Sequence, residues 1–215
     1  MSYYYKILLL SLIIPAALSF DKRIEFNKKF SYLFKATIFA SLPFVIWDIF
    51  FTKYKVWGFN ENFVSGFKII NLPIEEVLFF FIIPFCCIFN YHILKRYNFT
   101  FFNIKNWKDI HLTILVIAIF ISLLNISNIY TFVCLLFFSS VIIIEMFIIS
   151  KINLNYFYSN FIIMLIPFTF VNGALTGLFF DQTVVWYNTS EIMGIYFFTI
   201  PVEDIIYMHQ MRLLY

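Results

Sequence analysis

The sequence predicts an all-α fold: a polytopic membrane helix bundle of about seven transmembrane helices, with two parallel three-helix repeats joined by a linking helix. Three observations support this prediction. The 215 residues are 62% hydrophobic and only 13% charged, and a soluble domain of this size could not bury so much apolar surface. Stretches approaching the ~20 apolar residues that cross a bilayer recur along the chain. One acidic motif, with its flanking residues, occurs twice.

The candidate spans follow one another with short polar breaks between them. We take the first as a spanning helix and not as a cleaved signal peptide. Four Lys and Arg residues between positions 22 and 29 follow it, whereas the charge of a signal peptide precedes its apolar core. The fourth span is short and ends at a tight turn over 125–128. The predicted spans are 3–20, 32–51, 67–92, 110–124, 129–149, 161–180 and 192–208.

Basic residues divide unevenly between the two sides that seven spans define. Eleven Lys and Arg residues fall on the side of the 21–31 and 93–109 segments, and four fall on the other side. The positive-inside rule places the richer side in the cytoplasm. We therefore expect a multi-pass protein of the cell (inner) membrane, with its N-terminus outside and its C-terminus in the cytoplasm.

The two halves of the chain carry the same signals around a P-x-E-[E/D] motif, which is P-I-E-E from Pro73 and P-V-E-D from Pro201. A glycine precedes each proline by seven residues, a tryptophan precedes the prolines by 16 and 15, and an aspartate closes the preceding apolar stretch. Agreement at this many positions indicates an internal repeat. The flanking residues are Gly66 and Gly194, Trp57 and Trp186, and Asp48 and Asp181.

The repeat predicts the domain organisation. Residues 1–94 form the first three-helix repeat, 95–128 form a connecting loop with the linking helix, and 129–215 form the second repeat. A single linking span gives both repeats the same orientation. Corresponding helices could then face each other across a pseudo-twofold axis and place four carboxylates around one cavity.

The paired carboxylates predict acid–base chemistry, because charged groups inside the membrane are costly and rarely lack a function. An ordinary helix start is the alternative, since Pro and acidic residues favour a first turn. That alternative fits the second motif poorly, because nine mostly apolar residues, 192–200, precede it. Burial and mutual repulsion would keep one acid protonated and its neighbour ionised. The catalytic candidates are Glu75, Glu76, Glu203 and Asp204.

Several neighbouring residues are candidates for binding substrate or supporting the acids. The ring faces of Phe79 and Phe80 could stabilise a carbocation, although most such aromatic residues only pack or face lipid. Asn172 could line the cavity or form a structural hydrogen bond. The remaining candidates are Pro73, Pro201, Asp48, Asp181, Trp57 and Trp186.

Other residue classes predict no further site. The three cysteines lie in apolar runs without the spacing of metal ligands, so we expect no metal. The three histidines are expected near the cytoplasmic membrane surface. Glu145, close to Lys151, is expected there too, in an interfacial or ion-paired role. A formal charge of +3 gives no reason to expect a nucleic-acid partner.

The motif set resembles the membrane-integral lycopene cyclase family, which occurs as two small subunits or as one fused chain. The matching residues in the first half are W-G-F-N and L-P-I-E-E-V-L-F-F. In the second half they are N-G-A-L-T-G, W-Y-N and I-P-V-E-D-I-I-Y. The resemblance covers 48–91 and 172–207. It implies a fused lycopene β-cyclase of carotenoid biosynthesis.

The resemblance also implies a chemistry. The family closes the linear ψ-ends of lycopene into β-rings, giving γ-carotene and β-carotene by an isomerisation (an intramolecular lyase reaction). The implied partners are lycopene and the lipid membrane, and a homo-oligomer or contact with other carotenoid enzymes stays open. Which motif carboxylate is acid and which is base is open too. Unrelated cyclases bind a flavin, but this chain has no G-x-G-x-x-G, so we expect no cofactor.

Three alternatives remain at this stage. A cyclase of the same family could act on a longer carotenoid or make ε-rings, and it could close one end or both. A proton-coupled transporter also carries buried carboxylates, but its usual inverted repeats and Gly-broken helices are not the pattern here. A seven-helix retinal protein would need a Lys in its last span, and 192–208 has none.

Overall fold

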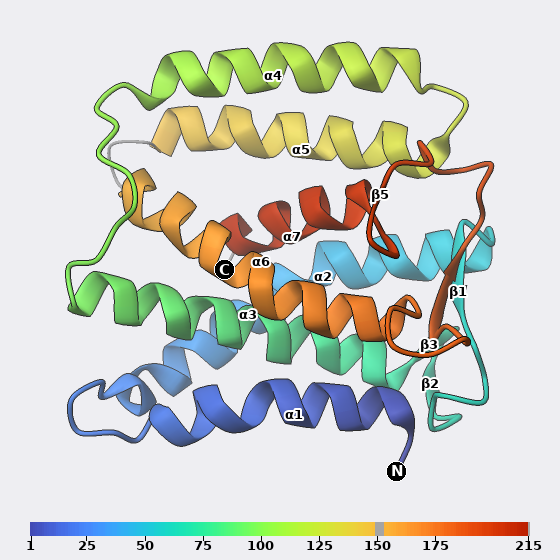
Figure 1. Cartoon of the computed structure of the whole chain (residues 1–215), viewed down its shortest axis with the longest axis horizontal. Helices are drawn as coiled ribbons and strands as arrows, with labels where there is room; N and C mark the ends of the chain where they lie inside the picture. The colour runs from blue at the N-terminus through green and yellow to red at the C-terminus, as the bar shows by residue number, and fades with distance from the viewer. Residues whose placement is uncertain (149–152, 215) are drawn as a thin grey trace.

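The structure is a computed structural model that describes residues 1–148 and 153–214. Within that part of the chain, seven α-helices run alternately in opposite directions along the long axis of the molecule (Figure 1). The predicted all-α helix bundle is confirmed. A short 3-10 helix, Phe26–Lys29, leads into the second α-helix. The helices are α1 (Tyr3–Leu18), α2 (Phe30–Lys53), α3 (Ile74–Arg96), α4 (Trp107–Leu124), α5 (Ile129–Ile148), α6 (Leu154–Leu175) and α7 (Val202–Leu214).

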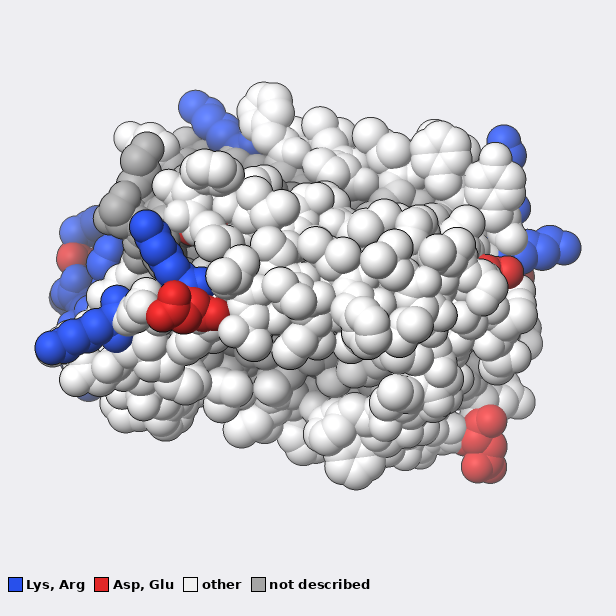
Figure 2. All heavy atoms as spheres, turned by 90° about the horizontal axis from the view of Figure 1, so that it is seen from above, with Lys and Arg blue, Asp and Glu red and all other residues white. Residues whose placement is uncertain are grey.

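Five of these helices, α2 to α6, are long and apolar enough to cross a membrane. Helix α1 is apolar but has 16 residues, and α7 has 13, so both are shorter than the ~20 residues that a full crossing takes. On the face seen in Figure 2, the charged side chains lie toward the two ends of the molecule and the wide zone between them is uncharged. This distribution is that of a multi-pass membrane protein.

The apolar residues before each motif form β-hairpins, which corrects two predicted helix boundaries. Strand β2 (Lys68–Ile69) pairs with β3 (Leu72–Pro73), and β5 (Tyr196–Phe197) pairs with β6 (Ile200–Pro201). The predicted spans 67–92 and 192–208 therefore begin too early, because hydropathy does not distinguish a short apolar hairpin from a helix.

Both motifs consequently begin a helix, and the helix-start interpretation holds for the second copy as well as the first. Gly66 and Gly194 enter the hairpins with φ of 84° and 77°, which glycine adopts without strain. The third boundary correction concerns α6, which begins at Leu154 and ends at Leu175, whereas the predicted span was 161–180.

The two halves meet through a strand pair at one end of the bundle. Strand β1 (Trp57–Phe59) pairs antiparallel with β4 (Val185–Tyr187), and Gly58 lies opposite Trp186. The hydrogen bonds that flank the strand pair are also equivalent in the two halves. Asn60 N donates to Val184 O at 2.8 Å, and Asn188 N donates to Val56 O at 2.9 Å. Each half thus contributes an equivalent strand to the pair.

This pairing corrects the assumed correspondence of the two tryptophans. The hydrogen-bonded residues of the two halves differ in number by 128, the same offset that relates Pro73 to Pro201. With that offset Trp57 corresponds to Val185, and Trp186 corresponds to Gly58. The indole of Trp186 lies over Gly58, where an added Cβ would be 2.4 Å from the ring.

The correspondence of the two aspartates is also corrected. Val56 N bonds back to Phe51 O, five residues earlier, while Val184 N bonds back to Leu175 O, nine residues earlier. The second connection is therefore four residues longer. Asp48 lies three residues before Phe51, and Asn172 lies three residues before Leu175. Asn172 is therefore the counterpart of Asp48. Asp181 is an exposed residue of the longer connection.

Candidate active site

A cavity of about 390 Å³ lies inside the bundle, with walls from every helix except α4 and from strands β1 and β4. Most of its wall is apolar, and its polar groups are carboxyl, amide and tyrosine side chains. Three carboxyls reach the cavity, and all of them are buried. These polar residues are Tyr4, Asp48, Glu76, Tyr91, Tyr130, Asn160, Asn172, Tyr187, Asp204 and Tyr207.

Asp204 accepts hydrogen bonds from three neutral donors. Tyr130 Oη lies 2.7 Å from one carboxyl oxygen, while Tyr187 Oη at 2.6 Å and Asn172 Nδ2 at 2.7 Å both reach the other. An ionised carboxylate only accepts hydrogen bonds, and donors of this number favour the ionised form. These three donors therefore stabilise the charge of an ionised Asp204 and oppose the effect of its burial.

Glu76 has a different environment, although it occupies the corresponding position of the first motif. Tyr4 Oη donates to it at 2.7 Å, and the carboxyl of Asp48 lies beside it. Tyr207 Oη donates to Asp48 at 3.3 Å. Two adjacent buried carboxyls favour retention of one proton between them, because two close negative charges repel each other.

The difference between the acids arises from a few substitutions on an otherwise repeated scaffold. Tyr4 and Tyr130 are equivalent, since each donates its hydroxyl to the second acid of a motif. Beside Glu76 stands Asp48, whereas Asp204 has the amide of Asn172. One half of the cavity therefore has two adjacent carboxyls, and the other half has a carboxyl beside an amide.

The first acid of each motif is buried beneath its hairpin and does not line the cavity. Glu75 accepts hydrogen bonds from Ser65 N and Ser2 Oγ, both at 2.6 Å. Glu203 accepts them from Met193 N at 2.8 Å and from Thr131 Oγ1 at 2.5 Å. The expectation that both acids of a pair edge one cavity is wrong, because adjacent helical positions point ~100° apart.

The other predicted site residues divide between the cavity and places outside it. Trp57, Phe79 and Asn172 line the cavity. Phe80 is buried but stacks on Phe44 in the core, with ring centroids 6.0 Å apart. Trp186 is 40% exposed. The prolines Pro73 and Pro201 end the hairpins and precede the motif helices, and Asp181 is exposed on its loop.

Sequence reasoning missed the tyrosines that hydrogen-bond the acids. The chain has 14 Tyr residues and most lie within or beside apolar segments, so nothing in their type or local pattern distinguishes these four. Only the spatial proximity of four separate segments to the two motifs identifies them. The four are Tyr4, Tyr130, Tyr187 and Tyr207.

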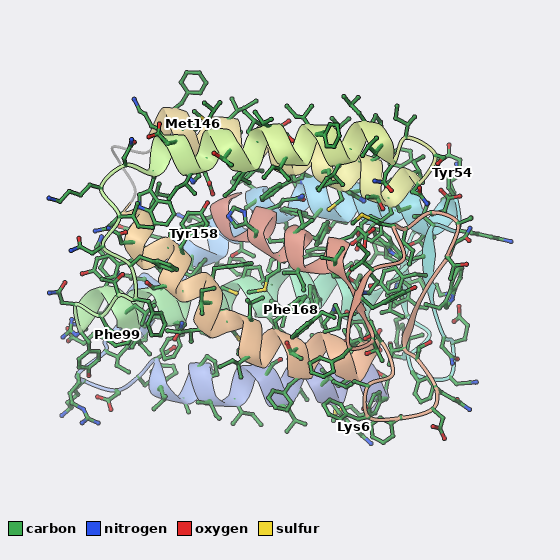
Figure 3. All side chains as sticks on the ribbon, turned by 45° about the horizontal axis from the view of Figure 1, so that its top comes forward. Lys6, Tyr54, Phe99, Met146, Tyr158 and Phe168 are labelled. Atoms are coloured by element: carbon green, nitrogen blue, oxygen red, sulfur yellow. The ribbon has the colours of Figure 1, made fainter. Side chains whose placement is uncertain are left out.

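A second group of titratable residues lies near the opposite end of the bundle. His111 Nε2 is 3.3 Å and His209 Nε2 is 3.7 Å from the Glu145 carboxyl, and all three residues are buried. Tyr158, labelled in Figure 3, donates to Glu145 at 3.3 Å. The expected place near this end of the bundle and an ion-paired Glu145 agree with the structure, whereas exposure of His111, His209 and Glu145 at the membrane surface does not. Lys151, the expected neighbour of Glu145, lies outside the described residues.

Comparison with known protein families is consistent with this geometry. A family model described as lycopene cyclase matches residues 1–94 and 127–215. The chain belongs to the lycopene cyclase family. The resemblance seen in the motifs is thereby confirmed, and the family implies a carotenoid cyclase. The matched segments of the cyclase leave out 95–126, which include the whole of α4. No curated protein and no solved structure matches the chain.

Proposed function

We propose that this cyclase is a lycopene β-cyclase that closes the ψ-ends of lycopene by non-redox acid–base chemistry. The observation that carries the proposal is the asymmetric set of three carboxyls in one apolar cavity. Asp48 and Glu76 lie together, and Asp204 is held by neutral donors, so we assign proton donation to the pair and proton acceptance to Asp204. A hydrocarbon offers no polar handle, so proton donation and removal are the chemistry that such a site can supply.

The Glu76–Asp48 pair supplies the proton in the first step. The proton adds to the terminal double bond of the ψ-end and leaves a tertiary carbocation. The next double bond along the chain attacks this centre, which forms the ring bond and moves the positive charge to a ring carbon. After the transfer Glu76 and Asp48 carry negative charge close to the cation, which stabilises it.

Asp204 completes the reaction by accepting a proton. Loss of the proton from the carbon at the ring–chain junction gives the β-ring, whereas loss from the ring carbon on the other side would give an ε-ring. The substrate gains one proton and loses one, so the reaction is an isomerisation and needs no cofactor. Return of the proton from Asp204 to the Glu76–Asp48 pair resets the site.

The cavity wall suits a carbocation. Aromatic rings of Trp57, Phe79 and Tyr207 border it, and ring faces attract cations. The apolar lining also keeps out water, which would capture the cation as an alcohol. Glu75 and Glu203 act through positioning, because each binds a loop N–H and a hydroxyl of the first helix of its repeat.

We also propose an inner-membrane location with the N-terminus outside. Lys6 and Tyr54 mark the end of the bundle that carries the hairpins, and Phe99 marks the opposite, more basic end (Figure 3). The positive-inside rule assigns the basic end to the cytoplasm. An impermeant thiol reagent should label a Lys55→Cys variant but not a Lys105→Cys variant in intact cells, and the reverse pattern would contradict this orientation.

The pigment profile of lycopene-accumulating cells that express this chain alone tests the function. β-Carotene or γ-carotene should appear, and the ratio shows whether both ends close. Unchanged lycopene, with the protein shown to be in the membrane, would contradict the assignment. ε-Ring products would retain the acid–base chemistry and correct the site of proton removal.

A further inference from the structure

The cavity is long, and the residues of one helix that line it show its length. Glu76, Phe79, Ile83, Cys87 and Tyr91 line it along a single face of α3. Their spacing of three and four residues is that of one continuous helical stripe. Fifteen residues separate the first from the last, which corresponds to ~22 Å along the helix axis.

Helix α6 lines the same length in the opposite direction. Asn172 lies at the carboxyl end, where it bonds Asp204. Phe157, fifteen residues earlier, lines the far end and belongs to the core cluster on which Tyr91 packs. Phe168 lines the cavity between these two and lies at the centre of the bundle (Figure 3). The lining residues of two antiparallel helices thus give the same tunnel length, ~22 Å.

The carboxyls of the tunnel lie at one end only. From Ile83 onward its α3 wall carries no acid, and the amide of Asn160 is engaged by Asn90 at 2.7 Å and by Cys87 O at 3.1 Å. One end is therefore built for proton transfer, and the rest is an apolar sleeve that can hold a hydrocarbon chain without reacting with it.

We propose that this tunnel takes a linear isoprenoid end-on, one end at a time, an inference that rests on the proposed cyclase function. The ψ-end lies between Glu76 and Asp204, and the conjugated chain runs past Cys87 toward Tyr91. An extended lycopene is about as long as the hydrocarbon core of a bilayer, ~30 Å. The tunnel is shorter, so the second end stays outside and each binding event closes one ring.

Adjacent cysteines on α3 provide a matched test. Cys87 lines the tunnel ~16 Å from Glu76, so Cys87→Phe would block it beyond the reacting end. Cys86 is equally small and buried but faces α1, where its thiol contacts Ser11 O at 3.5 Å. Cys86→Phe therefore measures the cost of a bulky side chain at a neighbouring buried position. Cys87→Leu is a milder block if the Phe variant does not accumulate.

Two substrates are compared, lycopene and a short apo-lycopenal with one ψ-end and a chain that ends before Cys87. Rates are normalised to folded protein in the membrane. We expect Cys87→Phe to lose at least about tenfold on lycopene, while its rate on the short substrate stays within about threefold of wild type. Cys86→Phe should treat both substrates alike.

The outcomes distinguish the tunnel from the cyclase assignment itself. If wild-type protein converts neither substrate, the proposed function fails and the tunnel fails with it. The other outcome is that wild type converts both substrates while Cys87→Phe keeps its rate on both or loses rate equally on both. In that case only the tunnel is wrong.

Discussion

Two adjacent acids of one motif have different structural roles. Glu75 holds a loop N–H and a serine hydroxyl under the hairpin, whereas Glu76 reaches the cavity. The second motif repeats the division with Glu203 and Asp204. The sequence predicted the four acids because charged residues stand out in apolar segments. It could not divide their roles, because the direction of each side chain depends on where the helix begins.

Replacing the acids one at a time tests this division. Glu76→Gln should lower the cyclisation rate at least about 100-fold, because general acid catalysis contributes ~10²–10⁴. Glu75→Gln keeps an oxygen acceptor for Ser65 N and should retain most activity. Turnover by membranes with equal protein content measures both variants. Comparable losses in the two would show that adjacent acids do not differ in role.

In the proposed mechanism, Asp48 gives the first half of the site its donor character. Asp48→Asn would give Glu76 an amide neighbour, the arrangement that Asp204 has with Asn172. Glu76 would then be held as an anion, and we expect cyclisation to fall at least about tenfold. The control is Asp181→Asn on the exposed loop, which should be silent. Full activity of Asp48→Asn would assign the donor role to Glu76 alone.

At the scale of elements, hydropathy located the helices but not their beginnings before the two motifs. The segments 67–73 and 192–201 are apolar enough to extend the helices that follow, yet they fold into hairpins. Glycines with positive φ, Gly66 and Gly194, enter these turns, and the motif prolines end them. The glycine-to-proline spacing of seven residues was visible in both halves, but it was used as evidence for a repeat and not for a turn.

The contact between Gly58 and Trp186 joins the two halves at the strand pair. Gly58→Ala should lower stability by ~1–3 kcal/mol, because its Cβ would overlap the Trp186 ring. Adding Trp186→Ala should remove this penalty, so the two effects are not additive. Thermal unfolding of the detergent-solubilised protein measures it.

Gly66→Ala is the control for the strand-pair contact. No atom lies within 4 Å of the added Cβ, but the φ of 84° penalises any side chain. Its cost should therefore persist in the Trp186→Ala background. If the stability cost of Gly58→Ala also persists in the Trp186→Ala background, contact with Trp186 is not the reason that a glycine is required at position 58.

At the scale of the whole molecule, duplication supplies a cavity between two similar halves. In the proposed mechanism, small differences between the halves give that cavity a proton donor and a proton acceptor. The parallel repeat and its place around one cavity were predictable from the doubled motif. The correspondence of individual residues was less so, because the connection after α6 is four residues longer than the one after α2. That insertion made Asp181 look like the partner of Asp48, a position that Asn172 occupies.

The central claim is that a proton from the protein enters the substrate and a different proton leaves it. A single turnover in deuterated buffer tests this most directly: lycopene is mixed with an excess of purified protein pre-equilibrated in D₂O, and the products are analysed by mass spectrometry. We expect one deuterium for each ring closed, and no product from Glu76→Gln. A cyclised product without deuterium would contradict proton donation by the exchangeable carboxyl pair.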